Sequence, residues 1–274
     1  MTNSTDRYIH AATRENTRKS YRAAIEHYES VWGGYLPATA DSVALYLAHY
    51  APTLAINTLK LRLSGLAAWH NDQGFPDPTK APHVKKVLKG IAELHPHSEA
   101  QAKPLRLKEL RTVVMWFDSN LESEACSRAH RLKFVRNKAL FLIGFWRAFR
   151  SDELTRISIE NVTVIPGKGL EIFLPRSKTD RRSLGRRVRV PALQQLCPVS
   201  AYLDWVNEAQ LRDGPLFQGI NRWGHLSENA LHPASVISII KKSCSGAGIS
   251  DSNDYSSHSL RRGFATWSNT QQWD

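Results

Sequence analysis

The first hundred residues carry large apolar side chains three or four positions apart, the spacing that gathers them on one face of a helix. Four segments show it: 21–32, 43–50, 59–70 and 79–94. Gly33, Pro52 and Gly74 follow the first three segments and mark where those helices end. Because the repeating side chains are mainly aromatic and aliphatic, they predict the core of a helical bundle rather than contacts to a cofactor.

The helical pattern stops between His95 and Pro104, where the sequence HPHSEAQAKP has no apolar repeat. Prolines and small polar residues in such a stretch are typical of a surface linker. We therefore expect an N-terminal domain at residues 1–97, a linker at 98–104 and a second domain at 105–274.

The second domain mixes helical repeats with short strands. Helices are predicted at 107–117, 127–146, 199–210, 233–245 and 257–267, and strands at 162–165, 170–174 and 187–190. The run from Ala139 to Trp146 is apolar on every side, which predicts a helix end buried on all faces. The expected fold class is therefore mainly α with a small antiparallel β-sheet, in which a helical bundle precedes a mixed α+β domain.

Charge indicates the kind of partner. The 274 residues carry a formal net charge of +12, with a sequence pI near 9.8. Most of the excess lies in residues 101–274, which hold 26 Lys and Arg against 16 Asp and Glu. Such a balance indicates a polyanionic partner, either nucleic acid or, less specifically, an anionic membrane surface.

Several other classes are excluded by what the sequence lacks. Cys126, Cys197 and Cys244 lie far apart without ligand spacing, so neither a zinc site nor a disulfide framework is indicated. The N-terminus has no apolar secretion signal, and no apolar run is long enough to span a membrane. We expect a cytoplasmic protein without a metal or a membrane partner.

The segment from Pro175 to Arg189, which leads from the second predicted strand into the third, is strongly basic. Its basic residues are Arg176, Lys178, Arg181, Arg182, Arg186, Arg187 and Arg189, and its single acid is Asp180. A charge run is usually a solvated loop. Here the one-signed charge favours a hairpin that lies along a phosphate backbone, with the ammonium of Lys178 at its tip.

A second candidate group follows the apolar helix, where Arg150 precedes Glu153 in the sequence RSDEL. An arginine leaving such a helix needs an anion, because a desolvated guanidinium is costly without one. Glu153 would supply that anion in a structural pair, and a ligand phosphate would supply it in a binding site. The segment alone leaves both interpretations open.

A third candidate pair, His258 and Arg261, opens a helix-prone segment. Groups at positions i and i+3 of a helix share a face, so this pair can present an acid-base group and a bidentate phosphate clamp to one phosphodiester. Taken alone, a buried histidine and a solvated arginine at a helix start is the simpler interpretation.

The order of these groups along the chain changes that assessment. Arg150 with Glu153, then Lys178 in a basic hairpin, then His258 with Arg261 resembles the tyrosine recombinase, or phage integrase, family over nearly the whole chain. The resemblance implies a SAM-like core-binding domain followed by a DNA breaking-rejoining catalytic domain. It implies DNA integration, excision or resolution by a bacterial or phage-encoded protein that needs no cofactor and forms a tetramer on double-stranded DNA.

In that family a tyrosine attacks a phosphodiester and forms a 3′-phosphotyrosyl link. Carried onto this chain, Arg150 and Arg261 hold the non-bridging oxygens, His258 acts as acid and base, and Lys178 protonates the leaving 5′-oxygen. Glu153 has the supporting role of orienting its neighbours. Contacts to the DNA backbone are expected from Arg176, Arg181, Arg182, Arg186, Arg187, Lys85 and Lys86.

The sequence departs from the family pattern at its end. The family places its nucleophilic tyrosine downstream of the His-x-x-Arg motif, but the sequence stops at Asp274, and Tyr255 lies before the motif. We therefore expect a chain truncated before the nucleophile, either a fragment or a naturally short protein, that binds DNA without cutting it and is impaired in oligomerisation. The alternatives are a non-catalytic basic helical regulator and a type IB topoisomerase-like enzyme.

Overall fold

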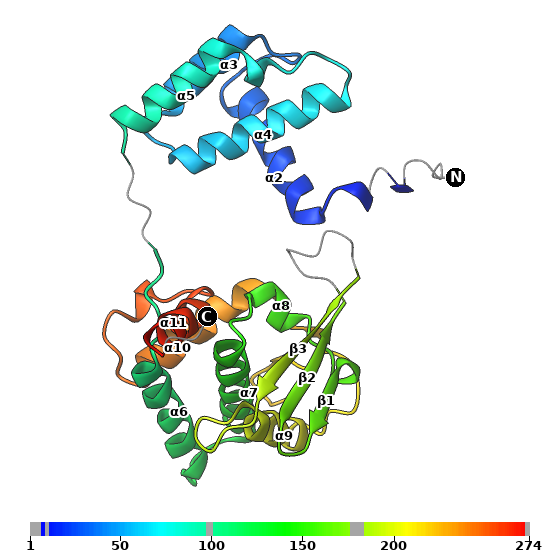
Figure 1. Cartoon of the computed structure of the whole chain (residues 1–274), viewed down its shortest axis with the longest axis vertical. Helices are drawn as coiled ribbons and strands as arrows, with labels where there is room; N and C mark the ends of the chain where they lie inside the picture. The colour runs from blue at the N-terminus through cyan, green and yellow to red at the C-terminus, as the bar shows by residue number, and fades with distance from the viewer. Residues whose placement is uncertain (1–6, 9–10, 97–100, 176–183, 272–274) are drawn as a thin grey trace. The chain divides into compact units, whose positions relative to one another are not determined.

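The computed structural model describes residues 7–8, 11–96, 101–175 and 184–271. The chain divides into two compact units, Met1–Ala100 and Gln101–Asp274 (Figure 1). Each unit has its own hydrophobic core. Of the linker predicted at 98–104, residues 98–100 lie outside the described residues.

The first unit is the predicted helical bundle. Its helices are α2 (Glu15–Glu26), which continues into a π-helical turn (His27–Val31), α3 (Ala40–Tyr50), α4 (Ile56–Asp72) and α5 (Pro82–Leu94). The aromatic and aliphatic repeats form its core, in which Tyr28, Tyr46 and Leu66 have no exposed surface. The helix predicted at 79–94 is divided, because a separate 3-10 turn (Pro78–Lys80) ends before Pro82 opens α5.

The second unit contains most of the helices and all the strands that the structure describes. Its helices are α6 (Leu107–Glu122), α7 (Arg128–Trp146), α8 (Ser151–Thr155), α9 (Pro198–Glu208), α10 (Pro233–Gly246) and α11 (Ser259–Thr270). Its strands are β1 (Val162–Ile165), β2 (Gly169–Leu174), β3 (Arg186–Pro191), β4 (Gln218–Ile220) and β5 (Leu226–Ala230). The predicted fold class, mainly α with a small antiparallel sheet, is confirmed.

Helix α7 is the centre of the second unit. It contacts α6 and α11 on one side, and α9 and strand β3 on the side of the sheet (Figure 1). Residues 139–145 of α7 are buried, which confirms the prediction of an all-round apolar helix end. Trp146 is only half-buried, and its indole Nε1 donates a hydrogen bond to the carbonyl oxygen of Leu196 at 2.9 Å.

Strands β1, β2 and β3 form one antiparallel sheet in that order. Along β3 the side chains alternate, so Val188 and Val190 are buried whereas Arg187 and Arg189 are exposed. The register places Arg189 opposite Glu171 of β2. The solvent face of the sheet therefore carries ion pairs and its other face joins the core.

The two-stranded sheet of β4 and β5 was not predicted from the sequence. The strands are three and five residues long, and the sequence of β5, Leu-Ser-Glu-Asn-Ala, lacks the alternating apolar pattern of a half-buried strand. Tertiary contacts hold the hairpin instead, since Arg136 of α7 donates through Nη1 to the carbonyl oxygen of Gln218 at 2.9 Å. In the described part of the chain, no helix has both the length and the apolar composition needed to cross a membrane.

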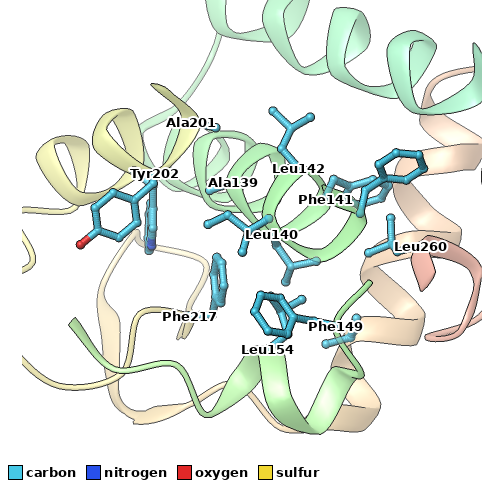
Figure 2. Close-up of a cluster of buried hydrophobic side chains, with 14 of the residues drawn as sticks. Ala139, Leu140, Phe141, Leu142, Phe149, Leu154, Ala201, Tyr202, Phe217 and Leu260 are labelled. Atoms are coloured by element: carbon cyan, nitrogen blue, oxygen red, sulfur yellow. The ribbon is translucent and has the colours of Figure 1, made fainter. Parts of the chain in front are cut away.

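The largest core cluster fixes the two segments that carry Arg150 and Arg261. Phe149 and Leu154 flank the start of α8, and Leu260 lies in the first turn of α11. All three are at most 2% exposed and belong to the same cluster as Leu140 and its neighbours on α7 (Figure 2). Packing of these neighbours sets the positions from which both arginines extend.

Candidate phosphate-binding site

Arg150 stands where the chain turns from α7 into α8. The turn contains Ala148 in the left-handed conformation, with φ +52°, and Arg150 is the N-cap residue of α8. Glu153 in the first turn of α8 accepts two hydrogen bonds at 3.1 Å, one from the backbone N–H of Arg150 and one from its Nη1. The structural pair that the sequence left open is therefore formed.

That pairing does not use up the guanidinium of Arg150. Its side chain is 26% exposed, whereas that of Glu153 is 1% exposed. Arginine has five N–H donors in a planar fork, and among the described residues only Nη1 of Arg150 has a protein acceptor. Glu153 therefore orients the side chain of Arg150, and the other N–H donors of the guanidinium stay available for a ligand anion.

Arg186 approaches the same carboxylate from the sheet. It is the first residue of β3, and its Nη2 lies 3.4 Å from Oε1 of Glu153. The sequence predicted a contact between Arg186 and DNA and did not predict this pair. The buried carboxylate of Glu153 thus pairs with two guanidinium groups, one from the start of α8 and one from β3.

Arg261 reaches the turn before α8 from α11, 113 residues after Ala148 in the sequence. It lies in α11, half-buried, and its Nη1 donates to the carbonyl oxygen of Ala148 at 3.1 Å. Two glycines allow the close packing that brings it there. A Cβ at Gly263 would overlap the carbonyl oxygen of Leu105, and a Cβ at Gly144 would lie 2.9 Å from Leu260 Cδ1.

His258 is the N-cap residue of α11 and its side chain is exposed. Its backbone N–H donates to Ser256 Oγ at 3.2 Å, while its imidazole has no hydrogen-bond partner among the described residues. The ring is accessible three residues before Arg261. The interpretation of this motif as a buried histidine is therefore wrong, because the histidine is solvent-accessible.

A further arginine belongs to this neighbourhood. Arg147 is the C-cap residue of α7, three positions before Arg150. Partial burial lowers the pKa of its guanidinium, and the positive charge of Arg186 lowers it further. The sequence analysis did not single out Arg147. The argument made for Arg150, that an arginine following an apolar helix needs an anion, holds equally for Arg147. Glu153 pairs here with Arg150 and Arg186, and Arg147 adds a further positive charge near Arg186.

Other predicted residues are not brought to this place. Arg187 lies on the solvent face of the sheet, where its Nη1 is 2.8 Å from Oε1 of Glu171. Lys85 and Lys86 are exposed on α5 in the other unit. Four residues of the predicted basic hairpin, Arg176, Lys178, Arg181 and Arg182, lie outside the described residues.

The two tyrosines of the second unit are both buried. Tyr255 is 1% exposed and Tyr202 is 5% exposed. Burial raises the pKa of Tyr255 to about 12, with a smaller contribution from the negative charge of Glu109. The hydroxyl oxygen of Tyr255 is itself buried and has no hydrogen-bond partner among the described residues.

The arrangement can hold an anion and neutralise charge that develops on it. Guanidinium groups from α8 and α11 flank one turn of backbone, and an imidazole lies at the start of α11. Donors fixed in this way match the non-bridging oxygens of a phosphodiester. Within the described ranges, no three His, Cys, Asp or Glu side chains are grouped as metal ligands would be.

Comparison with curated proteins gives a sequence match that covers nearly the whole chain. The chain is 30% identical over 270 residues to an integrase/recombinase xerD homolog of Selenomonas ruminantium, covering 95% of this chain and 75% of that protein. No family model matches.

Two solved structures have a similar fold. One is the XerH site-specific recombinase bound to its difH substrate in a pre-cleavage complex, with a TM-score of 0.59 at 20% identity, covering 93% of this chain and 70% of that one. The other is a lambda integrase tetramer bound to a Holliday junction, with a TM-score of 0.61 at 17% identity, covering 98% of this chain and 73% of that one.

Proposed function

The chain belongs to the tyrosine recombinase family, and from that premise we propose that it binds double-stranded DNA and holds a phosphodiester between Arg150 and Arg261. The observation that carries the proposal is the convergence of these two side chains on one turn. Arg261 is hydrogen-bonded to Ala148, two residues before Arg150, and Arg150 is oriented by the buried Glu153.

For a complete form of the protein, in which a tyrosine attacks the phosphodiester, the chemistry proposed for this site is transesterification of DNA through a 3′-phosphotyrosyl intermediate, in integration, excision or resolution. Arg150 and Arg261 donate to the non-bridging oxygens and stabilise the charge of the pentacoordinate phosphorus. His258, exposed next to them, moves the proton at the attacking oxygen. Lys178 protonates the leaving 5′-oxygen, and Glu153 keeps Arg150 in position.

The two parts of the chain have separate roles in this proposal. Residues 1–97 form a core-binding domain that contacts DNA through Lys85 and Lys86. Residues 105–274 form the catalytic domain, and residues 98–104 link the two. Arg176, Arg181, Arg182, Arg186 and Arg187 contribute positive charge along the DNA backbone.

We assign the nucleophile to neither Tyr202 nor Tyr255, the two tyrosines of the catalytic part, because both side chains are buried. Binding rather than cleavage is therefore the activity proposed for these residues. We also propose that the protein assembles with copies of itself on its DNA sites and acts in the cytoplasm of a bacterium. Support for assembly comes from the fold shared with the lambda integrase tetramer on a Holliday junction.

The proposal is tested by the salt dependence of DNA binding. Duplexes are first selected from a random-sequence pool by the wild-type chain, and their dissociation constant is then measured over a range of salt. Arg150→Ala and Arg261→Ala should each weaken binding and reduce the salt slope by about one. Arg128→Ala, which removes an exposed arginine at the opposite end of α7, should leave the slope almost unchanged.

A basic DNA-binding regulator would give a different result. It would bind duplex DNA through other surfaces, so Arg150→Ala and Arg261→Ala would behave like Arg128→Ala. Failure of the wild-type chain to select any duplex would reject DNA binding by these residues altogether. A loss of binding shared by all three variants would reject the assignment of the site to Arg150 and Arg261.

A further inference from the structure

Arg147 has a position that the proposed roles of Arg150 and Arg261 do not explain. It ends α7 as the C-cap residue, and the next residue, Ala148, is the one whose carbonyl oxygen accepts from Arg261. A guanidinium at this point lies at the edge of the turn around which the candidate site is built. Its side chain reaches solvent and has no carboxylate partner among the described residues.

The nearby carboxylate is already occupied. Glu153 accepts from the backbone and Nη1 of Arg150, and Arg186 lies 3.4 Å from the same oxygen that Nη1 contacts. A third guanidinium beside this cluster adds repulsion rather than pairing. Burial is the larger cause of the lowered pKa of Arg147, and the positive charge of Arg186 lowers it further, which agrees with that repulsion.

A structural role explains the position only in part. Cations are favoured near the C-terminus of a helix by the helix dipole, so the end of α7 tolerates a guanidinium. The helix dipole favours any cation at this position, so it does not explain why Arg147 lies near another arginine, Arg186. A cluster of like charges lowers the stability of the free protein, and a bound anion restores that stability. Such clusters are typical of binding sites.

We infer that Arg147, together with Arg186, binds a second phosphate of the same duplex, next to the phosphodiester held by Arg150 and Arg261. The inference rests on the proposed function, because it needs duplex DNA at this site. Consecutive phosphates of one strand lie several ångströms apart, so one cluster of fixed guanidinium groups can contact two of them. Bidentate geometry makes arginine better suited to this contact than lysine.

The test measures binding and stability for the same variants. Arg147→Ala should weaken binding of the selected duplex at least about tenfold, the equivalent of one charge-assisted hydrogen bond. It should also lower the salt slope by about one. Arg147→Lys keeps the charge, and it should recover the salt slope without recovering full affinity. Arg128→Ala, at the first position of α7, is the matched control because it removes the same charge from the same helix.

Thermal unfolding without DNA separates binding from structure. If Arg147 serves the ligand, Arg147→Ala relieves repulsion with Arg186, so its midpoint should equal or exceed that of the wild type. A fall in the midpoint that accompanies the loss of binding would show that Arg147 supports the fold, and it would overturn the inference. Binding and slope equal to those of Arg128→Ala would overturn it as well.

The DNA affinity of Arg147→Ala is compared with that of Arg150→Ala. If Arg150→Ala weakens binding and Arg147→Ala does not, only the second phosphate contact is rejected. If neither variant differs from the control, the proposed function fails, and the inference fails with it. If Arg147→Ala and Arg186→Ala each weaken binding and their double variant loses less than the product of the two effects, the shared contact is supported.

Discussion

Arg261 and Ala148 are 113 residues apart in the sequence, yet Nη1 of Arg261 donates to the carbonyl oxygen of Ala148 at 3.1 Å. The hydrogen bond ties α11 to the turn that precedes Arg150. It makes the position of Arg261 depend on the backbone of that turn rather than on Arg150 itself. Changes in the turn should therefore affect the site even where they remove no charged side chain.

Ala148→Gly is the mildest change in this turn. Ala148 has φ +52°, a conformation that is strained for residues with a Cβ and free of that strain for glycine. We expect the substitution to raise the free energy of unfolding by up to about 1 kcal/mol and to leave DNA affinity unchanged. Denaturant unfolding and duplex binding measure the two effects.

Ala148→Val is the opposing control for that prediction. A β-branched side chain fits the left-handed region poorly, so it should lower stability and also weaken DNA binding through Arg261. If Ala148→Val were more stable than Ala148→Gly, the left-handed conformation of residue 148 would not control the stability of this turn.

Glu153→Gln tests how far a buried carboxylate holds the arginine cluster together. Glutamine keeps an acceptor for Arg150 but removes the only negative charge that contacts both Arg150 and Arg186 in the described structure. We expect stability to fall by about 3 kcal/mol, because uncompensated charge remains next to a buried position. Chemical denaturation of the second unit measures this loss.

Glu171→Gln is a matched control, since Glu171 also pairs with two arginines, Arg187 and Arg189. Those arginines are 70% and 83% exposed, so water screens their charges. The pKa of Glu171 is lowered by its hydrogen bond to Arg187, but its loss should change stability far less than the loss of Glu153. Equal losses in the two variants would show that burial of Glu153 does not matter.

Much of the fold could be predicted because its signals are local. The apolar run of α7 occupies every side of a helix, and β1 to β3 carry short strand patterns separated by turn residues. The hairpin of β4 and β5 carries no such pattern. Its position depends on contacts such as that between Arg136 and Gln218, which are 82 residues apart, and sequence periodicity does not report contacts at that distance.

The candidate site could be predicted only residue by residue. The order of motifs predicts Arg150 and Arg261 as site residues, but their meeting at Ala148 depends on close packing by Gly144 and Gly263. Arg186 was predicted to contact DNA, and its pairing with Glu153 follows from strand alternation, which points it to the same side as Val188. The sequence of residue types does not specify which guanidinium pairs with which carboxylate.

Gly263→Ala should disturb the site through the backbone of the segment before α6. A Cβ at this position would overlap the carbonyl oxygen of Leu105, whose backbone N–H donates to Ser259 at 3.0 Å. Because the obstacle is backbone, α11 must move, and we expect a loss of about 1–3 kcal/mol in spite of the higher helix propensity of alanine. Weaker binding of duplex DNA should accompany it, since Arg261 lies two residues away.

Gly90→Ala provides the comparison for a helical glycine with room. Gly90 lies within α5, and a Cβ there would have no atom within 4 Å. The helix propensity of alanine should then raise the stability of the first unit by up to about 1 kcal/mol. If Gly263→Ala were stabilising like Gly90→Ala, the close packing of α11 would not hold Arg261 in place.

Tyr255→Phe should be tolerated near neutral pH and should change the response to alkali. The hydroxyl of Tyr255 is buried and has no hydrogen-bond partner among the described residues, so its removal leaves no polar group newly unsatisfied. We expect the stability to be unchanged or higher by up to about 1 kcal/mol. DNA binding should also be unchanged, because Tyr255 has no part in the candidate site.

The alkaline response follows from the direction of the pKa shift. Burial raises the pKa of Tyr255 from 10.0 to about 12, so the unfolded chain releases this proton at lower pH than the folded chain does. Stability is therefore lost as pH rises above 10, and the loss from this residue is complete near pH 12. Cys244 adds to it, because burial raises the pKa of its thiol to about 12. Midpoints of thermal unfolding across this range should fall less steeply for Tyr255→Phe than for the wild type, and parallel curves would show that Tyr255 does not titrate with unfolding.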